Sequence, residues 1–362
     1  MDCSRQVSTR LDKDAESWKL DHVSSPLFLR HRNPDITSKA FVDWIAENRS
    51  VIDDLVLEHG GVVLRQTPTQ NPEEFDTFTD VFPQHGGGYV GGAGPRSAIV
   101  GKVWEATKMA PQFKITIHQE MAYMANYPAR IAFFCSQPAE KGGETIVASM
   151  AEFMKGIPAS VMQKLEKHGI RGVRNYSPAH DADGKSTVQH IDEKSWDETF
   201  GTDDRNEVEE LCRARGMNPI WNDDGTLTLV TYIDAFTRHP ILDKLFYRNI
   251  IHIDFANTEV GADDEDQKKR LQKQKMPTGY AFGNGDAVTS LEIEELMTAL
   301  DEVTLAWKWE VGDIMILDNL QMGHGRNPYE GERETFVVLL GSSDQESKPD
   351  STVEDRQPST VN

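Results

Sequence analysis

Residues 303–318 read VTLAWKWEVGDIMILD, and this stretch indicates two β-strands joined by a tight turn. The strands are expected at 303–309 and 313–318, because aliphatic, aromatic and β-branched residues favour extended backbone. Gly312 supplies the flexibility that the intervening turn needs. A third strand is expected at 335–340, TFVVLL. The C-terminal part of the chain is therefore predicted to form sheet.

Further strands are expected nearer the N-terminus. Residues 113–120 (FKITIHQE) alternate between apolar and polar side chains, which is the period of a strand with one buried face. Short apolar runs at 131–136 and 145–148 indicate two more strands. Helical spacing of apolar residues predicts helices at 38–59, 70–82, 151–168, 205–215 and 290–301. Because the strands show no βαβ rhythm, the predicted fold class is β-rich α+β: a double-stranded β-helix (jelly-roll) core with flanking and inserted helices.

We expect one domain over residues 1–345, in which about 180–300 form an insertion of helices and loops, followed by a disordered acidic tail at 346–362. Residues 84–95 are rich in glycine and contain a literal GxGxxG pattern. No convincing strand precedes this pattern and Pro95 would stop a following helix, so a dinucleotide-binding turn is not indicated. A mobile loop is the preferred interpretation.

The charge balance is strongly acidic, with 38 Lys and Arg against 59 Asp and Glu and a formal net charge of −21. Nucleic acids and anionic membranes require a basic face, so we expect neither as a partner. No apolar run is long enough to span a membrane, residues 1–19 lack the apolar segment of a secretory signal, and the 3 cysteines form no CxxC pair. These features favour a cytoplasmic location and leave a homo-oligomer open.

Three side chains stand out as candidate metal ligands. His118 and Glu120 are two residues apart on the expected strand 113–120, so both project from the same face. His324 follows an expected buried strand and lies between two glycines that permit close backbone approach. Two imidazoles and one carboxylate form the facial triad of non-haem Fe(II) sites, which leaves open positions on the metal. The same donors suit catalytic zinc, although no HExxH motif is present, and ordinary hydrogen-bonded strand residues are a third interpretation.

A family resemblance bears on these alternatives. Residues 117–145, IHQEMAYMANYPARIAFFCSQPAEKGGET, resemble the Fe(II)/2-oxoglutarate dioxygenases of the taurine dioxygenase and clavaminate synthase-like superfamily. That group combines His-x-Asp/Glu, a following proline, an apolar strand and then Gly-Gly-Glu/Asp-Thr. Residues 307–326 (WKWEVGDIMILDNLQMGHGR) and 328–337 (PYEGERETFV) are also similar to the family and follow in the same order. The resemblance extends over residues 40–341.

The resemblance implies an oxidoreductase, a 2-oxoglutarate-dependent dioxygenase that uses Fe(II), 2-oxoglutarate and O2. The iron ligands that it implies, by position, are His118, Glu120 and His324. It also implies that Thr145 and Arg333 bind the distal carboxylate of 2-oxoglutarate, a role that suits a planar and permanently charged guanidinium. Arg326 is the alternative for the arginine role, although its position only two residues after a ligand favours a structural task.

The reaction implied is oxidation of a C–H bond in a small polar molecule, an amino acid or a derivative, by a ferryl formed as 2-oxoglutarate is decarboxylated to succinate. Hydroxylation in natural-product biosynthesis is the default expectation. Desaturation, epoxidation or ring closure, or a non-catalytic or zinc-dependent relative, are the alternatives. The taurine enzyme carries a second arginine four residues past the first, where this chain has Val337, so a sulfonate substrate is not expected. Candidate substrate contacts are Tyr123, Arg96 and Asn175.

Overall fold

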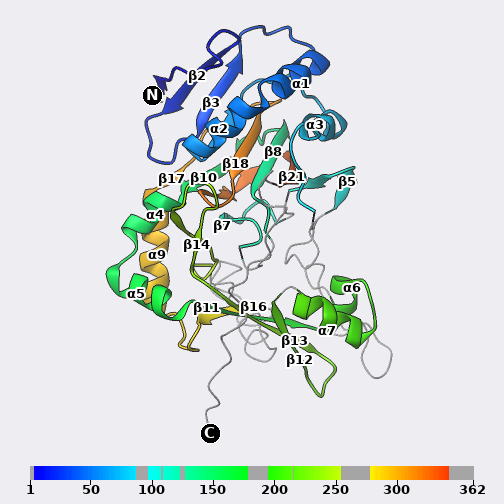
Figure 1. The fold of residues 1–362 in the computed structure, drawn as a ribbon, viewed down its shortest axis with the longest axis vertical. Coiled ribbons are helices and arrows are strands. Elements are labelled where there is room, and N and C mark those ends of the chain that lie inside the picture. The colour runs from blue at the N-terminus through cyan, green and yellow to red at the C-terminus, as the bar shows by residue number, and fades with distance from the viewer. Residues whose placement is uncertain are drawn as a thin grey trace.

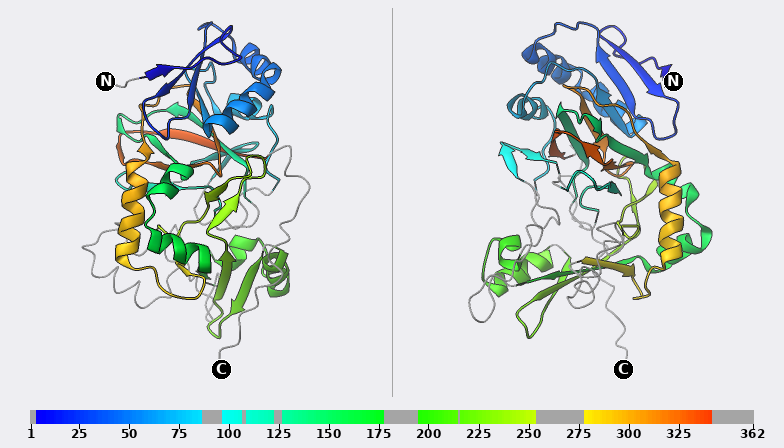
Figure 2. Two further views of the ribbon diagram at one scale, coloured as in Figure 1. Left: turned by 60° about the vertical axis from the view of Figure 1, so that its left-hand side comes forward. Right: turned by 180° about the vertical axis from the view of Figure 1, so that it is seen from behind.

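The computed structural model describes residues 4–86, 97–106, 109–122, 127–177, 195–214, 216–253 and 278–341. Within these residues the chain has the predicted β-rich α+β character. Two β-sheets pack against each other, and one hydrophobic cluster draws side chains from both (Figure 1). Helices cover the outer face of the larger sheet, and a third sheet lies at the opposite end of the molecule (Figure 2).

The larger sheet has nine strands in the order β1-β2-β3-β4-β18-β8-β21-β6-β5. The two strands β3 and β4 pair in parallel, and the other neighbours pair antiparallel. Its strands are β1 (Ser4–Gln6), β2 (Ala15–Leu20), β3 (Leu27–His31), β4 (Gly61–Leu64), β5 (Ala98–Val100), β6 (Val103–Glu105), β8 (Arg130–Gln137), β18 (Ile314–Asp318) and β21 (Glu334–Leu340). The strands predicted at 131–136, 313–318 and 335–340 are therefore confirmed.

Side-chain alternation gives this sheet two different faces. Phe134 and Ile316 belong to a core shared with the N-terminal helices, whereas their neighbours Phe133 and Met315 belong to a core shared with the smaller sheet. Both faces are covered, which explains why the central strands read as continuous apolar runs. The N-terminal helices are α1 (Ser38–Glu47), α2 (Arg49–His59) and α3 (Pro72–Thr79).

The smaller sheet has the order β17-β10-β19-β7 and carries four residues discussed from the sequence, namely His118, Thr145, His324 and Arg326. Two glycines let its strands approach closely. A Cβ atom added at Gly325 would lie 2.4 Å from the carbonyl oxygen of Ile115, and one at Gly323 would lie 2.6 Å from a methyl carbon of Ile117. The strands are β7 (Ile115–His118), β10 (Thr145–Ser149), β17 (Thr304–Leu305) and β19 (Met322–Arg326).

The third sheet, in the order β12-β13-β11-β16, was not predicted from the sequence. The interpretation of about 180–300 as helices and loops is wrong for the strands inside it. Residues 227–233, LTLVTYI, follow an Asp-Asp-Gly turn and pair with both neighbours, so a strand pattern was present within a segment that is polar on average. The strands are β11 (Ile170–Tyr176), β12 (Met217–Trp221), β13 (Leu227–Ile233) and β16 (Thr278–Phe282).

Helices flank the third sheet, and two small two-stranded sheets, β14-β15 and β20-β9, complete the described part of the fold. The helices predicted at 205–215 and 290–301 are confirmed by α7 and α9. The helices are α4 (Met150–Gly156), α5 (Ala159–His168), α6 (Trp196–Phe200), α7 (Arg205–Ala214) and α9 (Ser290–Glu302). The remaining strands are β9 (Lys141–Gly142), β14 (Phe236–Arg238), β15 (Leu245–Tyr247) and β20 (Tyr329–Glu330).

Several predicted elements have different boundaries in the structure. The helix expected at 38–59 is divided at Asn48, whose side chain donates to the carbonyl of Trp44 and ends α1. The helix expected at 151–168 is divided before Pro158, because a proline disfavours helical backbone in the preceding residue. The strand expected at 303–309 shortens to β17, and the glycine-rich loop beyond residue 86 and the tail at 346–362 lie outside the described residues. No described helix has the length and apolar character needed to cross a membrane.

Candidate metal centre and adjoining carboxylate pocket

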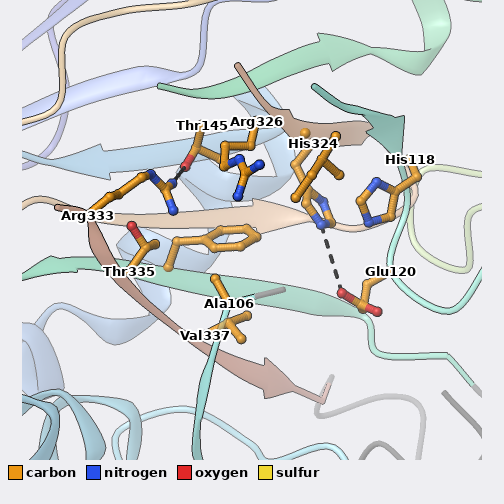
Figure 3. Close-up of a pocket in the computed structure, with 12 residues that line it drawn as sticks. Ala106, His118, Glu120, Thr145, His324, Arg326, Arg333, Thr335 and Val337 are labelled. Carbon is orange, nitrogen blue, oxygen red and sulfur yellow. Dashed lines mark hydrogen bonds and ion pairs between the residues drawn. The ribbon is translucent and has the colours of Figure 1, made fainter. Parts of the chain in front are cut away.

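A pocket lies between the two packed sheets, and it gathers most of the predicted site residues (Figure 3). Strands β7, β10 and β19 of the smaller sheet form one wall, and strands β8 and β21 of the larger sheet form the other. The residues that line it are Ala106, Ile115, His118, Glu120, Phe133, Thr145, His324, Gly325, Arg326, Arg333, Thr335 and Val337. Residues from five strands, distant in the sequence, therefore share one cavity.

The three candidate ligands converge at one end of this pocket. His118 and His324 are paired across β7 and β19, and their ring centroids are 4.6 Å apart. Nε2 of His324 lies 3.9 Å from Oε2 of Glu120, and one ligand atom from each residue falls within 4.8 Å of the others. Glu120 and His324 are buried, with exposures of 5% and 4%. Two imidazole nitrogens and a carboxylate oxygen at this spacing are a donor set that fits a first-row divalent metal such as Fe(II).

The route by which Glu120 reaches the site differs from the prediction. Strand alternation was expected to direct both members of the pair, but β7 ends at His118 and Glu120 belongs to the following turn. Met121 adopts a left-handed backbone conformation with φ of +55°, which turns the chain immediately after the carboxylate. The expectation that one strand carries both His118 and Glu120 is therefore wrong. The turn that follows β7 directs the side chain of Glu120 into the pocket, and strand alternation does not.

Hydrogen bonding sets the tautomer of the first histidine. Nδ1 of His118 lies 2.9 Å from the carbonyl oxygen of Thr116 and donates to it, so the lone pair of the neutral ring resides on Nε2. Metal-bound histidines generally have their second ring nitrogen oriented in this way. In this tautomer, Nε2 is the nitrogen of His118 that could bind a metal. The ring of Phe133, with its centroid 4.9 Å from that of His324, packs beside the second histidine.

The other end of the pocket carries a cation. Nε of Arg333 donates to the carbonyl of Gly143 at 2.8 Å. Its Nη2 donates to Oγ1 of Thr145 at 3.2 Å (Figure 3). Burial, followed by the charge of Arg326, lowers the pKa of Arg333 to about 10, so the group stays charged at neutral pH. Within the described residues, no carboxylate lies close enough to form an ion pair with it. A desolvated cation of this kind favours an anionic ligand.

Arg326 has a different set of contacts. Its guanidinium donates to three backbone carbonyls, those of residues 109, 110 and 113, at 2.8–3.0 Å. It also lies over the ring of Tyr329, 4.9 Å from the centroid, and it is only 4% exposed. These bonds fix the segment that leads into β7. The geometry therefore supports a structural task for Arg326 and leaves the anion-facing position to Arg333.

The three candidate substrate contacts lie in different places. Tyr123 and Arg96 lie outside the described residues. Asn175 belongs to β11 in the third sheet, where it accepts a hydrogen bond from Thr228 at 2.7 Å, and it does not line the pocket. Val337 lines the pocket and is fully buried, so the wall at this position is apolar.

Three further lining residues, Phe133, Thr335 and Ala106, were not predicted as site residues from the sequence. Phe133 lines the pocket and its neighbour Phe134 does not, a difference that strand alternation between the two faces could have revealed. Thr335 lies on β21 and Ala106 directly follows β6, and the pairing of these two strands brings both residues to the site. No local pattern in the sequence signals these two residues.

Similarity to known proteins identifies the family of the chain. The model of the "Taurine catabolism dioxygenase TauD, TfdA family" matches residues 26–340. The chain belongs to this family. The predicted membership of the Fe(II)/2-oxoglutarate-dependent dioxygenases of the taurine dioxygenase and clavaminate synthase-like superfamily is thus confirmed, and with it the assignment as an oxidoreductase.

Individual relatives are similar over most of their length. The chain is 30% identical over 331 residues to the clavaminate synthase-like protein At3g21360 of Arabidopsis thaliana, covering 90% of this chain and 95% of the relative. It is 26% identical over 305 residues to the dapdiamide synthesis protein DdaC of Enterobacter agglomerans, covering 84% and 88%. The crystal structure of PvcB from Pseudomonas aeruginosa has a TM-score of 0.50 at 14% identity, covering 91% of this chain and 93% of PvcB, which supports a shared fold.

Proposed function

We propose that this chain is an Fe(II)/2-oxoglutarate-dependent oxygenase that oxidises a C–H bond of a small polar molecule, an amino acid or a derivative. A single observation carries the proposal: a His-Glu-His cluster and an arginine without an acidic partner among the described residues occupy opposite ends of one pocket. We further propose that the two packed sheets form a double-stranded β-helix core, and that residues 1–345 make up one catalytic domain.

The cluster would hold the metal on one face. His118 would bind it through Nε2, His324 through its imidazole and Glu120 through its carboxylate, a donor set that suits Fe(II). When bound, the iron supplies the activation of O2 that is coupled to decarboxylation of 2-oxoglutarate to succinate. The protein's own part is to orient the three ligand side chains.

The cationic end of the pocket suits the distal carboxylate of 2-oxoglutarate. A guanidinium has five N–H donors, of which Arg333 uses two on Gly143 and Thr145, so three are left to face an anion. The hydroxyl of Thr145 accepts from Arg333 and can donate its own proton to the same carboxylate. A dicarboxylate spanning the pocket would therefore meet a cation at one end and the metal at the other. Phe133 and Val337 add apolar surface to the wall of the same pocket.

The substrate class rests on several separate considerations. Val337 is apolar and buried, which disfavours binding of a sulfonate at that wall. One relative is described as a dapdiamide synthesis protein, and PvcB is described as an Fe, alpha-ketoglutarate dependent oxygenase from an isonitrile synthetic pathway. These descriptions support a place for this chain in the biosynthesis of small natural products. Hydroxylation is the proposed outcome.

An anaerobic titration tests the proposal. Fe(II) and 2-oxoglutarate added together to the metal-free protein should produce a weak visible charge-transfer band, and Zn(II) with 2-oxoglutarate should not. His324→Ala should abolish the band, whereas the surface variant Lys141→Ala, which alters an exposed ion pair with Glu330, should retain it. If the wild-type protein gives no band and forms no succinate with a panel of amino acids, the proposal is refuted.

A further inference from the structure

Glu120 is held by a buried side chain that is not itself a ligand. We infer that Asn319 is a positioning residue that fixes the Glu120 turn and thereby sets the affinity of the site for its metal; this inference rests on the proposed function. Asn319 is 0% exposed. Its Oδ1 accepts from the backbone N–H of Glu120 at 2.8 Å, and its Nδ2 donates to the carbonyl of the same residue at 2.9 Å.

The two bonds from Asn319 to the backbone of Glu120 resemble those that a neighbouring strand would make. Strand β7 ends at His118, so Glu120 lies beyond the ladder that pairs β7 with β19. The amide of Asn319 offers one acceptor and one donor in the arrangement of a neighbouring peptide group, and it satisfies both groups of Glu120. A second bond from Nδ2, to the carbonyl of Pro128 at 2.9 Å, holds the amide in this orientation.

The turn needs this external support because its own backbone is unfavourable. Met121 has φ of +55°, a conformation that costs a non-glycine residue free energy and persists only where the surroundings impose it. Gln119, on the other side of Glu120, donates from Nε2 to the carbonyl of Leu320 at 2.9 Å. Hydrogen bonds to residues 319 and 320 therefore hold both Glu120 and the residue before it.

The same contacts connect the two segments that carry ligands. Asn319 lies in the connection between β18 and β19, five residues before His324. Oδ1 of Asp318 fixes that connection by accepting from the backbone N–H groups of Leu320 and Gln321, both at 3.0 Å. Glu120 and His324 are thus tied together through the protein before any metal binds. Preorganisation of this kind avoids the cost of ordering the ligands during binding.

The test compares variants at Asn319 with a control in the same connection. Asn319→Ala removes all three side-chain hydrogen bonds. Gln321→Ala removes a single bond, from Nε2 to the carbonyl of Leu57 at 2.9 Å, and leaves the Glu120 turn untouched. Fe(II) affinity is measured by anaerobic titration of the metal-free proteins, and thermal unfolding is measured without metal. Changes around a ligand's supporting contacts typically lower metal affinity about 10- to 100-fold, and we expect a loss in this range for Asn319→Ala and less than about 3-fold for Gln321→Ala.

A second, milder variant keeps the inference testable if Asn319→Ala does not fold. Gln119→Met keeps the shape of a buried side chain and removes the bond to Leu320, together with an amide oxygen that has no hydrogen-bond partner among the described residues. We expect it to fold as the wild type does and to bind Fe(II) about 3- to 10-fold more weakly, a smaller loss than for Asn319→Ala because one hydrogen bond is removed instead of three.

The outcomes separate this inference from the proposed function. Wild-type protein that binds Fe(II), with variants that bind it equally well, would overturn the positioning role and leave the function intact. The positioning role is also overturned if Asn319→Ala and Gln321→Ala lower thermal stability equally with no difference in metal affinity. Wild-type protein that fails to bind Fe(II) would instead remove the proposed function on which the inference rests.

Discussion

The replacement Arg333→Ala should weaken 2-oxoglutarate binding far more than it affects the metal. The substitution removes a partly buried guanidinium that has three N–H donors left to face the pocket, enough for a two-pronged contact with a carboxylate. Hydrogen bonds to charged groups contribute about 1.5–3 kcal/mol each, so two of them amount to about 3–6 kcal/mol. Water entering the vacated space recovers part of this, and about 1.4 kcal/mol corresponds to a tenfold change, so the Kd should rise roughly 100- to 1000-fold.

The assay is an anaerobic titration of 2-oxoglutarate at saturating Fe(II), followed through the charge-transfer band. Lys141→Ala is the control for loss of a positive charge, because Lys141 is exposed and paired with Glu330. Fe(II) affinity without 2-oxoglutarate should stay within about threefold of the wild type, because Arg333 donates to Gly143 and Thr145 rather than to a ligand. An unchanged Kd for 2-oxoglutarate in Arg333→Ala would refute this assignment and make Arg326 the next candidate.

The remaining predictions concern the hydroxyl, the close strand contact, the metal and pH. Thr145→Val should raise the Kd for 2-oxoglutarate about 3- to 10-fold in the same titration, the cost of one hydrogen bond; no change would exclude Thr145 from the carboxylate site. Gly325→Ala should destabilise the fold by about 3 kcal/mol or more in urea unfolding, because its Cβ would lie 2.4 Å from a backbone oxygen of Ile115; a loss below about 0.5 kcal/mol would show that β7 and β19 can separate freely. Fe(II) at about 100 times its Kd should stabilise the protein by about 2.7 kcal/mol in the same unfolding assay, with no effect on His324→Ala. Burial lowers the pKa of His252 to about 4, below its ordinary value of 6.5, so the unfolded chain takes up the proton first and stability should fall as pH drops from 6.5 towards 4. Between pH 6.5 and 4, the free energy of unfolding of His252→Gln should therefore fall by up to about 3 kcal/mol less than that of the wild type. An equal fall in both proteins would contradict the assigned pKa shift.

Much of the site could be predicted from the sequence because its residues lie in short, distinctive motifs. His118 and Glu120 stand two apart at the end of an alternating segment, and His324 lies between glycines whose role in close strand packing the structure explains. Arg333 follows at the spacing that the family resemblance implies, and it lies in the same pocket. These features are local in the chain, so a single sequence can reveal them.

Other features depend on contacts between distant segments and have no local signature. The turn that directs Glu120 is held by Asn319, a residue 199 positions away, and nothing near either residue indicates the bond. Alternation at 113–120 predicts that His118 and Glu120 lie close together, but the strand ends two residues before Glu120, which is hydrogen-bonded to Asn319 instead.

The third sheet was missed for a different reason. Its strand β13 has a β-rich sequence at 227–233, but the surrounding residues are polar. The average polarity of about 180–300 therefore predicts helices and loops, and it conceals the strand. Its pairing with β11, some 50 residues earlier, is what stabilises the strand. Helix boundaries at Asn48 and Pro158 were readable in principle, since a capping side chain and a proline are both established helix-ending signals.

Three side chains are proposed to hold one iron ion while an arginine holds the far end of 2-oxoglutarate. Anomalous diffraction at the iron edge, from crystals grown anaerobically with Fe(II) and 2-oxoglutarate, tests both parts at once. We expect one strong peak about 2.0–2.2 Å from His118, Glu120 and His324, with a carboxylate of 2-oxoglutarate against Arg333. An iron peak elsewhere, or 2-oxoglutarate bound away from Arg333, would contradict this assignment.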